Sequence, residues 1–162
     1  MKYFRTTLAA LLCMNLAAAH AQDMPSGHAH AHHERMTDGR TILTLTPGER
    51  MMVLEEMRLF LDGVGKLTGA LGKQDMQAAA AAAHEMGMKM AHEMPPALRA
   101  KLPMEFRQLG FSVHRDFDQI AMDAESLKDV SHSLNQLSAT LQNCVSCHAA
   151  YQIRTPLNDD KH

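Results

Sequence analysis

The sequence of 162 residues contains no Trp, and aromatic residues make up only 4% of it. Val and Ile are scarce beside Ala, Leu and Met. Sheets favour aromatic and β-branched residues, whereas Ala, Leu and Met favour helices, so this composition disfavours a β-sandwich or barrel and predicts an all-α fold. Apolar residues account for 46% of the chain, which is enough to build the core of a single domain.

The chain also lacks an excess of either charge, since 16 basic and 18 acidic residues give a formal net charge of −2. Proteins that bind nucleic acids through their phosphates are usually strongly basic, so nucleic-acid binding is not expected. No Ser/His/Asp set, phosphate-binding loop or pair of carboxylates stands out as a catalytic centre. The sequence therefore predicts a protein that is not an enzyme.

No apolar run approaches the ~20 residues of a membrane-spanning helix. A shorter run, from Leu8 to Ala19, follows Lys2 and Arg5 and precedes Ala19-His20-Ala21. A basic start, a short apolar middle and small residues around a cleavage site are typical of a secretory signal peptide. We expect a signal peptide over residues 1–21, cleavage near Ala21 and a periplasmic protein without a membrane span.

Cysteine is rare, and Cys13 lies inside the predicted signal peptide. The other two, Cys144 and Cys147, precede His148 and form C-x-x-C-H, the attachment sequence of c-type haem. On a helix the two sulfurs lie about one turn apart, where they can bind both vinyl groups of one porphyrin while His148 ligates the iron. A thioredoxin-like pair would need a βαβ context and a zinc site would need further ligands, and neither is indicated. One covalently bound haem c is therefore expected.

Residues 22–45 contain Gly, Pro, Ser and the run His28–His33, show no helical or strand period, and are expected to form a flexible leader. Thr46-Pro47-Gly48-Glu49 then predicts a helix start with a capping box. Four segments follow in which apolar residues recur at spacings of three and four. They cover about residues 54–71, 76–93, 106–127 and 130–151. This pattern predicts an antiparallel four-helix bundle over residues 46–155 and a C-terminal tail over residues 156–162.

A haem-attachment motif on the last helix of such a bundle resembles the class II cytochromes c, which include cytochrome c′ and its low-spin relatives. The resemblance covers roughly residues 46–155 and rests on Cys144-Val145-Ser146-Cys147-His148 with Tyr151 three residues further on. It implies that His148 is the proximal ligand and that Tyr151 packs on the haem. It leaves room for a homodimer, since many members pair through their first two helices.

The resemblance also places the sixth-ligand position on the first helix. Met57 lies on the apolar stripe of that helix and is the expected distal ligand, while Leu54 is the alternative that would leave the iron open. Two positions depart from the family: Gln152 follows Tyr151 where a basic residue is common, with Arg154 two residues later, and Val53 stands where an Arg often contacts a propionate.

Two other segments contain residues that bind transition metals. The His28–His33 run is a candidate for Cu²⁺, Zn²⁺ or Ni²⁺. On one continuous second helix His84, Met88 and His92 would line up for Cu(I), although the same helix needs its other Met residues for the core. His114 and His132 are expected on solvated helix faces.

The leading functional prediction is a single-electron carrier that exchanges electrons with redox partner proteins. A five-coordinate protein that binds NO or CO is the first alternative, and a copper-handling protein is the second.

Overall fold

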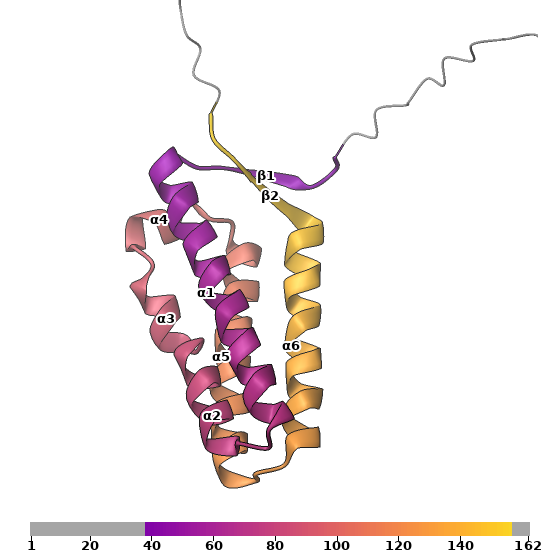
Figure 1. Cartoon of the computed structure of the whole chain (residues 1–162). Coiled ribbons are helices and arrows are strands. Elements are labelled where there is room, and N and C mark those ends of the chain that lie inside the picture. Colours follow the sequence, from indigo (N-terminus) through magenta and orange to yellow (C-terminus); the bar gives the residue numbers. More distant parts are fainter. Residues whose placement is uncertain (1–37, 157–162) are drawn as a thin grey trace, which may run out of the picture. The chain divides into compact units, whose positions relative to one another are not determined.

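The computed structural model of the chain describes residues 38–156 (Figure 1). These residues are mostly helical, which confirms the all-α prediction. The helices are α1 (Pro47–Gly72), α2 (Met76–Glu85), α3 (Met88–Glu93), α4 (Pro96–Lys101), α5 (Met104–Ser126) and α6 (Val130–Ala150), and the strands are β1 (Thr41–Thr44) and β2 (Tyr151–Arg154). The predicted signal peptide, the His28–His33 run and the predicted tail after Pro156 lie outside the described residues.

The first long helix begins as its sequence predicts. The Thr46 hydroxyl accepts a hydrogen bond from the Glu49 backbone N–H at 3.3 Å, and the Glu49 carboxylate accepts one from the Thr46 N–H at 3.0 Å. This capping box satisfies two of the amide groups that have no partner within the first turn. The Lys101 ammonium group also contacts the Glu49 carboxylate and thereby ties α4 to the start of α1.

The prediction of one continuous second helix is wrong, because the chain breaks between α2 and α3 at Met86 and Gly87. The Asp118 side chain from α5 lies against Gly87, where a Cβ atom would collide with its carboxylate. The same carboxylate accepts the Met88 backbone N–H at 2.9 Å. Because Gly87 has no side chain, the Asp118 carboxylate can approach the backbone closely, and α2 ends and α3 begins at this point.

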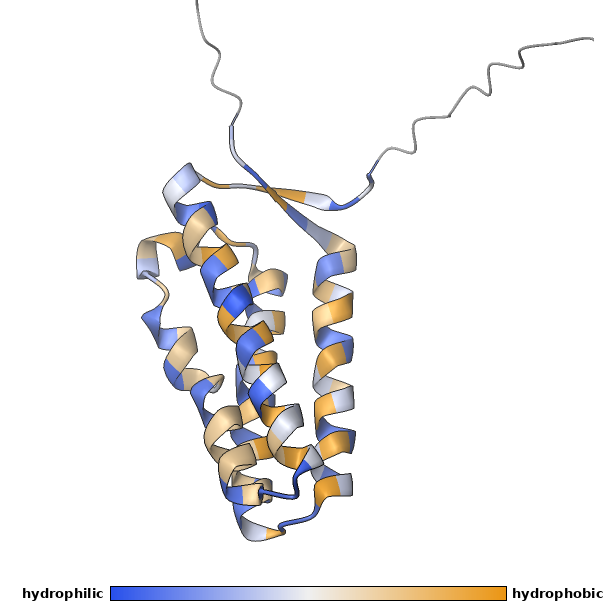
Figure 2. Ribbon diagram, viewed as in Figure 1, coloured by the Kyte–Doolittle hydropathy of each residue, from blue (hydrophilic) through white to orange (hydrophobic). Residues whose placement is uncertain are grey.

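The long helices pack in chain order, α1 against α2, α2 against α5 and α5 against α6. Leu67, Phe117 and Ile120 are completely buried in the core between them. The small side chains of Ala79 and Ala83 are also completely buried and let α2 lie close to its neighbours. Figure 2 shows apolar and hydrophilic residues alternating along α1 and α6, as expected for amphipathic helices.

A two-stranded parallel ribbon joins the two ends of the described chain. Thr41 pairs with Tyr151 and Thr44 with Arg154, and the Leu45 N–H donates to the Arg154 carbonyl at 3.0 Å. The prediction of a flexible leader up to residue 45 is therefore wrong for this strand. Leu43 is buried in a second apolar cluster that includes Val53 of α1, and this packing stabilises β1. With only four residues, the strand is too short for an alternating hydrophobic pattern to be recognised in the sequence.

Candidate cofactor site

A cavity of about 830 Å³ lies among α1, α5 and α6, on the side where α1 and α6 face each other in Figure 1. Most of the side chains around it are apolar. From α1 and α6 these are Val53, Leu54, Met57, Phe60, Leu61, Val64 and Leu141. Its volume is in the range of cofactor sites in proteins. A second hollow at the end of α1, near Gln74, contains none of the predicted site residues.

All the predicted haem-binding residues line the larger cavity. Cys144, Cys147 and His148 belong to the wall formed by α6, and Tyr151 follows at the start of β2. Met57 belongs to the wall formed by α1 and is half-buried. The fold therefore brings the expected proximal and distal residues to the same cavity from different helices.

The neighbours of Met57 on α1 differ in their access to the cavity. Met51 and Met52 are 66% and 50% exposed and do not line it. Leu54 does line it, so α1 offers both a thioether and an aliphatic side chain to the same space.

Cys144 and Cys147 are half-buried free thiols. Burial raises the pKa of both thiols, because a thiolate loses hydration there, and the neighbouring Cys144 raises the pKa of Cys147 further. His148 lies on the exposed side of the last turn of α6 and still borders the cavity. The motif is thus accessible to a ligand that enters the cavity.

The cavity is also rich in arginine, which the sequence analysis did not anticipate. Six of the seven arginines in the described part of the chain line it, whereas no lysine of residues 38–156 does. They are Arg40, Arg50, Arg58, Arg99, Arg107 and Arg154. Arg50 and Arg58 lie on α1 and the other four lie on different segments, so no motif in the sequence connects the six. Arginine is the side chain best suited to bind carboxylates through paired N–H groups.

Four of these guanidinium groups have partners in the protein. Arg40 binds Asp38, Arg58 binds Glu55, and Arg154 donates to the Gln152 side chain. Arg99 donates to two backbone carbonyls, at 2.9 and 3.0 Å, and lies over the Phe111 ring.

The guanidinium groups of Arg50 and Arg107 make no hydrogen bond with any described residue, and Arg107 Nε is buried without an acceptor. A buried donor without a partner costs about 1–3 kcal/mol. An apolar ligand that carries carboxylates would satisfy it, and a haem with its two propionates has this chemistry.

His114 lies in the wall of the cavity rather than on a solvated face, so that prediction is wrong. Its side chain is 5% exposed, and its ring lies 4.9 Å from that of Phe60. Nδ1 lies 2.8 Å from the Met86 carbonyl oxygen and Nε2 lies 3.2 Å from Glu56 Oε1. A carbonyl only accepts, so Nδ1 of His114 carries the hydrogen of the contact with Met86.

The His132 side chain is 41% exposed, and its Nε2 lies 3.0 Å from Asp123 Oδ2. This contact holds the pKa of Asp123 below its ordinary value, and hydrogen bonds from Gln136 and Gln119 add to the effect. His132 does not line the cavity.

The candidate copper residues do not form the arrangement that was predicted. The helix break separates His84 on α2 from Met88 and His92 on α3. His84 Nδ1 lies 3.6 Å from Asp118 Oδ1. Within residues 38–156 no group of three or more His, Cys, Asp or Glu side chains is placed to hold a metal ion.

Comparison of the chain with protein-family models, curated proteins and solved structures found no match. None of the helices in the described residues has the length and apolar character needed to cross a membrane.

Proposed function

We propose that this chain is an exported cytochrome of the class II type, an antiparallel four-helix bundle that holds one covalent haem c and transfers single electrons. One observation carries the proposal: the C-x-x-C-H motif of α6 borders an apolar, arginine-lined cavity that also contains Met57. Sequential packing of α1, α2, α5 and α6 supports the bundle topology.

The residues of the motif have distinct roles. Cys144 and Cys147 each add an S–H group across a vinyl group, so that an S–C bond forms and the hydrogen goes to the second vinyl carbon. His148 provides an imidazole nitrogen for the proximal side and Met57 a thioether for the distal side. A bound haem supplies the one-electron iron couple, and the axial residues and the surrounding wall set its potential.

The arginines orient the group in the cavity. Arg107 would bind a propionate, because its Nε is buried without an acceptor, and Arg50 borders the same cavity as the candidate for the second propionate. The apolar side chains Leu54, Phe60 and Val64 exclude water from the remaining wall. A low local dielectric strengthens the contacts between charged groups there.

A five-coordinate protein that binds NO or CO is the second candidate function. The presence of Leu54 on the same wall as Met57 favours it, since an aliphatic side chain over the iron would leave the sixth position open.

The test is optical spectroscopy of the mature protein produced with haem-attachment machinery, oxidised and reduced, with and without carbon monoxide. Covalent haem with a low-spin spectrum that carbon monoxide does not change supports the electron carrier. A high-spin spectrum that shifts with carbon monoxide supports the gas-binding candidate instead. Absence of covalent haem in the wild type, with no difference from a Cys144→Ala/Cys147→Ala variant, overturns both.

A further inference from the structure

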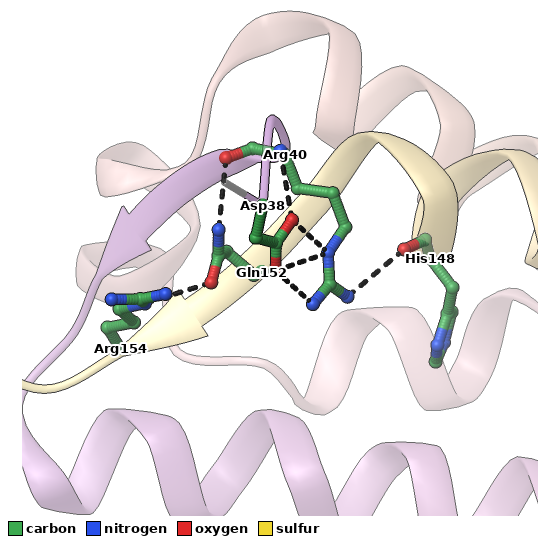
Figure 3. A network of polar contacts seen from close by, with 5 residues as sticks. All are labelled: Asp38, Arg40, His148, Gln152 and Arg154. Carbon is green, nitrogen blue, oxygen red and sulfur yellow. Dashed lines mark hydrogen bonds and ion pairs between the residues drawn. The ribbon is translucent and has the colours of Figure 1, made fainter. Parts of the chain in front are cut away.

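The strand that precedes α1 contacts the end of the helix that carries the haem-attachment motif. Figure 3 shows Arg40, the residue just before β1, between Asp38 and the last turn of α6. Arg40 Nη1 donates to the His148 backbone carbonyl at 3.3 Å. The two residues are 108 positions apart in the sequence, so this contact exists only because β1 pairs with β2.

The His148 carbonyl needs a partner from outside the helix. The last carbonyls of a helix have no N–H four residues further along the same helix. The Tyr151 N–H satisfies the Cys147 carbonyl, and Arg40 provides the donor for His148. The positive charge of Arg40 also lies at the negative end of the helix dipole of α6.

The whole guanidinium fork of Arg40 is used. Nε and Nη2 donate to Asp38 Oδ1 and Oδ2 at 2.9 and 2.6 Å, which leaves Nη1 free to reach His148. The Arg40 carbonyl accepts from the Gln152 side chain at 3.2 Å, which ties the same residue to β2. A lysine cannot make the two sets of contacts at once, because its donors lie on one nitrogen.

We propose that β1 is part of the proximal haem site and that Arg40 is a positioning residue for His148. Arg40 donates a hydrogen bond to the backbone carbonyl of His148, and its own carbonyl accepts one from Gln152 of β2, just beyond the end of α6. The His148 imidazole itself points away from this network in Figure 3. The inference rests on the proposed function, since it assigns a role to the segment before α1 in the same site.

The experiment uses the mature holoprotein and compares Arg40→Gln and Arg40→Lys with Arg115→Gln. Arg115 is the control because it carries the same charge but is exposed and does not line the cavity. The measurements are haem content, reduction potential, Soret circular dichroism and thermal unfolding. Lysine keeps the charge of Arg40, so any shift that remains in Arg40→Lys reports geometry rather than charge.

We expect Arg40→Gln to keep covalent haem and helical content but to shift the potential and the Soret dichroism. Arg40→Lys should recover only part of that shift, and Arg115→Gln should leave the Soret dichroism unchanged. The proposal is overturned if Arg40→Gln has wild-type spectra and potential, or if it changes only the unfolding temperature. Should Arg40→Gln fail to accumulate, Asp38→Asn must change the Soret dichroism, because it removes the carboxylate that holds the Arg40 side chain in place, and unchanged dichroism there overturns the proposal.

The haem content of the wild type shows whether the positioning role of Arg40 or the proposed function has failed. A wild-type protein without covalent haem overturns the proposed function and this role of Arg40 with it. A haem-containing wild type with an unaffected Arg40→Gln variant overturns only the positioning role.

Discussion

Nε2 of His114 lies 3.2 Å from Oε1 of Glu56, which precedes Met57 in α1, and both side chains are largely buried in the wall of the cavity. The other ring nitrogen is bonded to the Met86 carbonyl, at the break between α2 and α3. One imidazole thus connects the helix that carries Met57 to the end of α2.

Replacing His114 by Leu should therefore destabilise the fold. The substitution leaves a buried carbonyl and a largely buried carboxylate without partners, at a cost of about 1–3 kcal/mol. Denaturant unfolding followed by circular dichroism measures the loss. His132→Leu is the control, because the His132 side chain is 41% exposed and should cost less. Equal losses for the two variants would contradict the role assigned to His114.

The carboxyl of Asp38 should give an acid-dependent contribution to stability. Its hydrogen bonds with Arg40 lower its pKa from 3.8 to about 2. Because the pKa is depressed in the folded state, the contribution is present above pH 4 and disappears as the pH falls towards 2. Unfolding free energies of the wild type and Asp38→Asn should differ above pH 4 and converge below it. A constant difference across this range would show that the ion pair does not contribute.

Much of the fold follows from local sequence. The capping box at Thr46 and Glu49 and the apolar spacing in α1, α5 and α6 depend on neighbours within a turn or two. The break at Gly87 does not, because it requires an acceptor from Asp118, 30 residues away from Met88. The strand β1 was missed for the same reason, since its partner lies at the other end of the chain.

The part of the candidate site that forms a sequence motif could be predicted from the sequence. Cys144, Cys147 and His148 lie within five residues and were named from the motif. Met57 was named because the family resemblance points to the first helix and Met57 lies on the apolar stripe of that helix. The arginines around the cavity come from four elements and the residue before β1, and no sequence motif connects them. His114 was predicted to be solvated because it lies on the polar side of its helix. Its partner Glu56 belongs to another helix, and the sequence does not show that the two side chains meet.

If the cavity holds the proposed haem, Arg107→Gln should lower the reduction potential and make it more dependent on pH. Loss of a positive charge near the iron favours the oxidised form, and a propionate that loses its arginine is protonated more readily. Potentiometric titrations between about pH 5 and pH 9 measure both effects. Arg115→Gln is the control, since Arg115 lies on the same helix but is exposed and does not line the cavity. Identical titrations for both variants would remove Arg107 from the propionate site.

Met57→Ala distinguishes the two candidate functions. If the thioether is the distal ligand, the variant keeps its covalent haem, because Cys144 and Cys147 are unchanged, but converts from low spin to high spin and binds carbon monoxide. Met52→Ala should leave the spectrum unaltered, since Met52 is 50% exposed and does not line the cavity. A spectrum unchanged by Met57→Ala would instead assign Met57 to packing. The open space beside Leu54 would then become the feature that determines function, because an iron without a thioether ligand has a position free for a diatomic gas.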